Sequence, residues 1–108
     1  MKKVIKYDKL VRDNIPKIIN DKGKECKYHI ESGLDYRKRL FDKMIEELEE
    51  FKIDSNIEEA ADMLAVFRAL IKCHNIQLMD VIYAEGKKLE ERGAFTKGII
   101  LDEVIEKG

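Results

Sequence analysis

The sequence predicts an all-α fold, with helical hairpins that build a core of the four-helix-bundle type. Three observations predict it. Apolar residues recur at spacings of three and four over long stretches, capping residues stand before these stretches, and one stretch is apolar nearly all round. We expect dimerisation to complete the core and short irregular or β segments at the ends. The length of 108 residues is typical of one domain, which we place over residues 1–108.

Composition narrows the class of protein. Hydrophobic residues make up 44% of the chain, which is enough for a packed core rather than disorder. The 21 basic and 22 acidic residues leave a net charge of −1, which argues against a partner that is a nucleic acid polymer. A phosphate-bearing small molecule stays possible, because local charge decides its binding. The chain has neither a secretory signal nor an apolar run long enough to span a membrane. We therefore expect a cytoplasmic protein with free thiols at Cys26 and Cys73.

The first two helices have clear boundaries in the sequence. Asp13-Asn14-Ile15-Pro16 joins a capping residue to a proline in the first turn, and Asp21-Lys22-Gly23 ends this short helix. Residues 24–31 are expected to form an extended or irregular connector. Ser32-Gly33 begins the second helix, which ends at Asp54-Ser55. Its apolar stripe comprises Leu40, Phe41, Met44, Ile45, Leu48 and Phe51.

The third helix bears on assembly. The capping box Ser55-Asn56-Ile57-Glu58 begins it, and Asn75 ends it. Residues 63–71 are apolar nearly all round, so this helix should be buried on most sides. A chain this short has too few helices to surround it, which predicts a homodimer or a higher symmetric oligomer. A fourth helix is expected from Gln77 to Arg92, with Gly93 as its terminator. Residues 98–101 could form a strand or a packed irregular segment.

Two pairs of carboxylates carry the chemistry. Glu47 and Glu50 lie along one edge of the second helix's apolar stripe, and Glu59 and Asp62 are neighbours on the third helix. Because only eight residues separate Glu50 from Glu59, a tight hairpin would bring Glu50 level with Glu59 and Glu47 level with Asp62. Four carboxylates so placed repel one another unless a cation lies between them. Oxygen ligands favour Mg²⁺, with Mn²⁺ as an alternative.

Not every acidic residue of this region needs such a role. Acidic runs on helices are usually solvated faces. Glu58 is explained by the capping box, whereas Glu46 and Glu49 can pair with Lys43 and Lys52. Two carboxylate pairs that face each other across a tight hairpin are much rarer by chance.

Other kinds of site fit less well. A di-iron bundle would need Glu-x-x-His on two helices, and the chain has none. His29 and His74 are isolated, as expected of surface or capping residues. The sequence also lacks HExxH, a P-loop, GxGxxG and GxSxG.

Glu47-Leu48-Glu49-Glu50 followed by Glu59-Ala60-Ala61-Asp62 resembles the ExxE…ExxD signature of the all-α nucleoside triphosphate pyrophosphohydrolases. These include MazG-like proteins, dimeric dUTPases and phosphoribosyl-ATP pyrophosphohydrolase. The start, from Tyr7 to Pro16 (YDKLVRDNIP), and the end, from Arg92 to Ile99 (RGAFTKGI), resemble a small subgroup of house-cleaning enzymes that destroy non-standard nucleotides. The resemblance covers nearly the whole chain.

The resemblance implies cleavage between the α- and β-phosphates, which yields a nucleoside monophosphate and pyrophosphate. It assigns Mg²⁺ binding to Glu47, Glu50, Glu59 and Asp62. Glu47 or Glu50 would activate the attacking water. The basic positions of the family are matched by Lys87, Arg92 and Lys97, and in a dimer Lys9 or Arg12 of the second copy could also reach the metal site.

Two departures from the family bear on the substrate. The spacer between the acidic motifs is shorter than in many relatives, and Ala94 stands where a second glycine is common. The preferred base therefore stays open. Two rival functions remain: phosphoribosyl-ATP hydrolysis in histidine biosynthesis, and a helical oligomerisation or regulatory module without catalysis.

Overall fold

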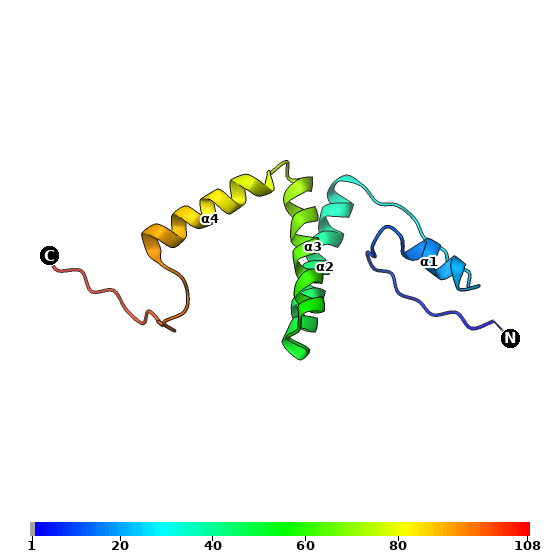
Figure 1. The fold of residues 1–108 in the computed structure, drawn as a ribbon, viewed down its shortest axis with the longest axis horizontal. Helices are drawn as coiled ribbons and strands as arrows, with labels where there is room; N and C mark the ends of the chain where they lie inside the picture. The colour runs from blue at the N-terminus through cyan, green and yellow to red at the C-terminus, as the bar shows by residue number, and fades with distance from the viewer. Residues whose placement is uncertain (1) are drawn as a thin grey trace. The chain divides into compact units, whose positions relative to one another are not determined.

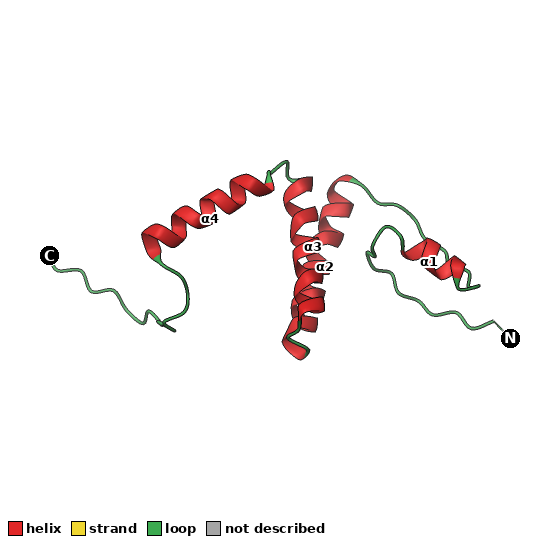
Figure 2. Cartoon of the chain, in the orientation of Figure 1, coloured by secondary structure: helices red, strands yellow, loops and turns green. Residues whose placement is uncertain are grey.

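Within residues 2–108, which this computed structural model describes, all regular structure is helical (Figures 1 and 2). The elements are α1 (Ile15–Asp21), α2 (Gly33–Ile53), α3 (Ile57–Cys73) and α4 (Leu78–Arg92). The all-α prediction is confirmed. Residues 98–108 have no regular structure, so the tail takes the irregular form and not the strand.

The chain divides into two compact units. One extends to Asn75 and contains α1, α2 and α3, whereas the other comprises Ile76–Gly108 and contains α4. The single domain expected over residues 1–108 stays a prediction. Across the described part of the chain, every helix is too short or too polar to cross a bilayer.

Helix α1 has the predicted boundaries. Asn14 is its N-cap and Pro16 stands in the first turn, where the missing N–H costs no hydrogen bond. The helix ends at Asp21, and two residues later Gly23 has a φ of +77°, in the left-handed region that glycine tolerates best. From there an irregular connector leads to Ser32, the N-cap of α2, in agreement with the prediction for residues 24–31.

Helices α2 and α3 form an antiparallel hairpin with a tight turn (Figure 1). In the turn, the Asp54 N–H donates to the Glu50 carbonyl at 2.9 Å, and the Ser55 hydroxyl donates to the Phe51 carbonyl at 2.8 Å. Both bonds satisfy carbonyls at the end of α2 that lack a partner within the helix. This turn lets carboxylates of the two helices face each other.

The capping residue of α3 differs by one position from the prediction. The side chain of Asn56, not of Ser55, accepts a hydrogen bond from the Glu59 N–H at 2.9 Å. Ser55 instead closes α2. Glu59 thereby takes the third helical position, so Glu58 has no capping-box role. The sequence offers two overlapping solutions here, because Ser and Asn are both strong N-caps and Glu occupies both third positions.

The core of the first unit is thin. Leu40 of α2 and Leu70 of α3 are its buried hydrophobic residues, exposed by 2% and 9%. The prediction that α3 is buried on most sides is wrong for the single chain, because Leu64 is 48% exposed. The α2–α3 contact covers only one side of α3.

Helix α4 begins after Gln77 and ends at Arg92, and Gly93 follows it as the predicted terminator. Gly93 has a φ of +82° and donates its N–H to the Leu89 carbonyl at 2.9 Å. Arg92 lies in the last turn, where a positive charge interacts favourably with the helix dipole.

Candidate metal centre

Helix α2 contributes one buried carboxylate. Glu47 follows Leu40 by two turns and therefore shares the face that packs on α3. It is only 7% exposed, the one charged residue among the buried ones described. A buried carboxylate is costly unless cations or hydrogen-bond donors surround it, so this position needs a compensating positive charge.

Helix α3 contributes two carboxylates one turn apart. Glu59 and Asp62 are half-buried and lie on the side of α3 that faces Glu47. One oxygen of each of the three carboxylates lies within 4.8 Å of the others. The facing pair Glu47 and Asp62, expected from the hairpin, is therefore brought together, with Glu59 as the third member. We call Glu47, Glu59 and Asp62 the acidic cluster.

Glu50 is placed differently from the other three predicted ligands. Its side chain is exposed and it does not belong to the group whose oxygens converge. On the helical wheel Glu50 points further from the apolar stripe than Glu47 does. Its charge nevertheless acts on Glu59, so Glu50 borders the acidic cluster.

The mutual repulsion of these carboxylates affects the pKa of Glu59. Desolvation raises the pKa of Glu59 above 4.5, and the charges of Asp62, Glu50, Glu47 and Asp54 add to that effect. The carboxylate form is therefore disfavoured at this position. A divalent cation between the carboxylates would reverse the effect by stabilising all the ionised forms.

Two basic side chains partly neutralise the cluster. Arg12 donates to Asp62 at 2.7 Å, and the Lys43 ammonium lies 3.3 Å from a Glu47 oxygen. Lys43 belongs to α2 itself, one turn before Glu47, whereas Arg12 precedes α1. Two cations against three carboxylates leave the cluster with an excess of negative charge.

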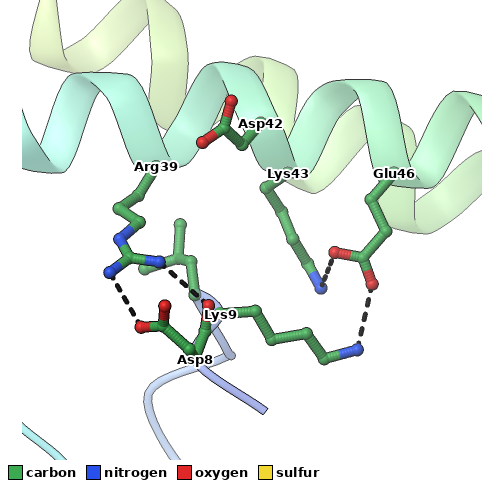
Figure 3. A pocket seen from close by; sticks show the side chains of 7 residues that line it. Asp8, Lys9, Arg39, Asp42, Lys43 and Glu46 are labelled. Carbon is green, nitrogen blue, oxygen red and sulfur yellow. Dashed lines mark hydrogen bonds and ion pairs between the residues drawn. The ribbon is translucent and has the colours of Figure 1, made fainter.

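A second ionic group adjoins the cluster along α2 (Figure 3). Glu46 accepts hydrogen bonds from Lys9 at 3.0 Å and Lys43 at 3.3 Å. Desolvation tends to raise the pKa of Glu46, but its bond from Lys9 and the charge of Lys43 outweigh it and lower the pKa. Lys9, Lys43 and Glu46 line part of a small cavity of about 90 Å³ together with Asp8 and Arg39.

Arg39 joins three parts of the first unit. It donates to Glu31 of the connector at 2.9 and 3.2 Å, and to the carbonyl and carboxylate of Asp8 at 2.9 and 3.0 Å. The hydrogen bonds from Arg39, then from His29, lower the pKa of Glu31 to about 2. Arg39 thus fixes the segment before α1 on the N-terminal half of α2.

The histidines behave as predicted. His29 pairs with Glu31 at 2.7 Å, and His74 contacts the Leu70 carbonyl at 2.8 Å near the end of α3. In the part of the chain that the structure describes, neither joins a group of possible metal ligands. The two thiols are free, as expected.

The remaining predicted basic residues belong to the second unit. Lys87 and Arg92 are on α4, and Lys97 follows it. The Lys87 ammonium lies 6.0 Å from the centre of the Tyr83 ring, a cation–π distance. Their role as phosphate ligands stays a prediction.

The donor set fits a hard divalent cation. It consists of carboxylate oxygens alone, which suit Mg²⁺ and Mn²⁺ rather than zinc or copper. At a Mg–O distance of about 2.1 Å, two oxygens on opposite sides of one ion lie about 4.2 Å apart. Adjacent oxygens on an octahedral ion lie only about 3.0 Å apart, so the three oxygens, which lie within 4.8 Å of one another, would have to move closer together around the ion. Glu47, Glu59 and Asp62 are the residues that could hold the ion.

The sequence did not reveal all of the site's partners. Lys43 was expected to pair with Glu46, but its contact with Glu47 was missed, although the four-residue spacing indicates it. Arg12 was expected near the metal from a second copy, whereas the same chain's Arg12 contacts Asp62. The ion pairs of Arg39 could not be predicted, because its partners Asp8 and Glu31 lie in irregular segments.

Comparisons with family models, with curated proteins and with solved structures gave no match for this chain. The resemblance to the all-α pyrophosphohydrolases stays a prediction, carried by the ExxE and ExxD motifs and by the two ends of the chain.

Proposed function

We propose that the chain is a Mg²⁺-dependent nucleoside triphosphate pyrophosphohydrolase that acts on non-standard nucleotides. It would cleave between the α- and β-phosphates and release pyrophosphate. The observation that carries the proposal is the convergence of Glu47, Glu59 and Asp62 from two facing helices, with basic side chains at its edge. Glu47 is buried within this group, which distinguishes the group from an ordinary solvated acidic face.

The residues divide the chemistry among them. Glu47, Glu59 and Asp62 would bind the cation, which would polarise the phosphate and neutralise charge on its oxygens. Glu50 borders this cluster without belonging to it, so its carboxylate is free to orient a water molecule and take its proton. We therefore assign the base role to Glu50 rather than to Glu47.

Basic residues would bind the leaving pyrophosphate. Lys9 and Arg12 already lie at the edge of the acidic region, where they pair with Glu46 and Asp62. Cations so placed stabilise the negative charge that develops on the leaving group. Lys87, Arg92 and Lys97 are proposed to contribute further phosphate contacts.

The test is an assay of pyrophosphate release in the presence of Mg²⁺. The panel of substrates comprises standard nucleoside triphosphates, modified nucleoside triphosphates and phosphoribosyl-ATP. Glu59→Gln should abolish turnover, whereas the adjacent Glu58→Gln, which changes an exposed residue outside the cluster, should keep it. Preference for phosphoribosyl-ATP would indicate histidine biosynthesis instead. Absence of turnover across the panel would favour a non-catalytic helical module.

We also propose that two copies associate through the apolar face of the hairpin. On α2 this face comprises Leu34, Phe41, Ile45 and Leu48, all between 46% and 79% exposed. These residues fall within about 60° of one another on the helical wheel. Leu64 and Ile57 of α3, 48% and 82% exposed, continue the face. Soluble monomers rarely expose apolar patches of this kind, and a second hairpin would build the four-helix core.

Light scattering at micromolar concentration tests the assembly. The mass should be at least twice that of the 12.6 kDa chain, and Ile45→Lys should shift it toward the monomer. The matched variant Asp42→Lys, at an exposed position of the same helix outside the apolar face, should leave the mass unchanged. An active monomer of the natural sequence would contradict the dimer.

A further inference from the structure

The segment before α1 is held against α2 and reaches the acidic cluster. We call residues 8–12 the N-terminal strap. At one end Arg39 donates to the backbone carbonyl and the carboxylate of Asp8 (Figure 3). Leu10 is half-buried. At the other end, Arg12 donates to Asp62 at 2.7 Å. The strap thus brings a cation to a proposed metal ligand that is 50 residues away in the sequence.

The Arg12 guanidinium and a divalent cation need the same group. Asp62 belongs to the acidic cluster, and its Oδ1 accepts the hydrogen bond from Arg12. A metal ion bound by Glu47, Glu59 and Asp62 would place its positive charge beside the guanidinium. Both cations are therefore bound together less favourably than either alone.

The two ends of the strap differ in how firmly they are held. The Arg12–Asp62 pair is exposed, with side-chain exposures of 63% and 39%, and such pairs contribute little to stability. The Arg39 side chain is only 28% exposed and makes hydrogen bonds to both Glu31 and Asp8. The Arg12 side chain can therefore leave Asp62 while Arg39 still holds Asp8.

We propose that Arg12 is an exchangeable counter-ion: it occupies Asp62 in the metal-free protein, and a divalent cation displaces it. The released guanidinium, still held near the site by the anchored strap, then binds the polyphosphate of the substrate. This inference rests on the proposed function. It makes metal binding and nucleotide binding mutually supportive, because the metal releases the side chain that the nucleotide needs.

Calorimetric titration of the 108-residue chain with Mn²⁺ alone tests the exchange. Arg12→Gln removes the competitor and should bind Mn²⁺ about two- to five-fold more tightly than the natural sequence, as expected for loss of an exposed ion pair. Arg12→Lys keeps the charge and should bind with intermediate affinity. Lys17→Gln is the matched control, because Lys17 is 78% exposed and pairs with Asp21 outside the site; it should bind Mn²⁺ as the natural sequence does.

A second titration separates this role from a merely structural one. With Mn²⁺ saturating, a triphosphate analogue that carries a methylene group between the α- and β-phosphorus atoms should bind more weakly to Arg12→Gln. Tighter metal binding together with weaker nucleotide binding would support the exchange.

Mn²⁺ affinity equal to or lower than that of the natural sequence in Arg12→Gln would overturn the exchange and leave the metal site standing. Absence of Mn²⁺ binding in every variant and in the natural sequence would overturn the proposed function and the exchange with it.

Discussion

The cap of α3 determines where Glu59 lies, and its removal has a calculable cost. In Asn56→Ala the Glu59 N–H loses the acceptor that it meets at 2.9 Å. Replacing an N-cap side chain by alanine costs about 1 kcal/mol, within a range of about 0.5–2 kcal/mol. In a domain of about 100 residues, 1 kcal/mol lowers the melting temperature by roughly 4–8 °C. Thermal unfolding followed by circular dichroism, without divalent cations, measures this shift.

Ser55→Ala is the matched comparison. Its hydroxyl donates to the Phe51 carbonyl at 2.8 Å in an exposed turn, where water can replace the donor, so its loss should cost less than half as much. If Ser55 were the cap and Glu58 its partner, the order would reverse. A larger loss of stability in Ser55→Ala than in Asn56→Ala would therefore refute the assignment of Asn56 as the cap.

Three other predictions concern charged residues. Because the pKa of Glu31 is lowered to about 2 from 4.5, its carboxylate stabilises the fold above pH 4.5. Glu31→Gln should therefore have a lower unfolding free energy than the natural sequence at pH 6, and this difference should shrink toward zero as the pH falls to 2. Because the pKa of Glu59 is raised above 4.5, Mn²⁺ affinity in calorimetry should begin to fall at a higher pH than for an ordinary glutamate, and Glu59→Gln should lack this part of the pH dependence. Arg92→Ala should lower kcat/KM by a factor that corresponds to about 1.5–3 kcal/mol of activation free energy if Arg92 binds phosphate, whereas unchanged kinetics with a small loss of stability would assign Arg92 to the end of α4.

The helices were predictable because their boundaries depend on local chemistry. Pro16 fits the first turn of α1, and Gly23 and Gly93 take positive φ angles just beyond the ends of α1 and α4. Both helices have the expected limits. The cap of α3 was missed by one residue, because Ser55 and Asn56 are equally suitable and only the tertiary turn decides between them.

The acidic cluster was predictable in outline. The period of the helix and the short turn bring Glu47 opposite Asp62, and the structure confirms that these two and Glu59 converge. Glu50 was predicted to converge with the other three carboxylates, but it is exposed and lies outside the group whose oxygens converge, because a small rotation of α2 decides whether this carboxylate points inward or to solvent. In the structure α2 is rotated so that Glu47 is buried and Glu50 is exposed.

The contacts of the N-terminal strap could not be predicted. Residues 8–12 have no regular structure and no periodicity that assigns them a face. Their partners, such as Asp62 for Arg12, lie far along the chain. Such pairs depend on the path of irregular segments, which a pattern of apolar and polar residues does not specify.

Anomalous X-ray scattering from Mn²⁺-loaded crystals tests the central claim most directly. We predict a manganese peak within coordination distance of oxygens from Glu47, Glu59 and Asp62, together with an Arg12 side chain that no longer contacts Asp62. A peak at other residues, or no peak at a Mn²⁺ concentration that supports turnover, would contradict the account.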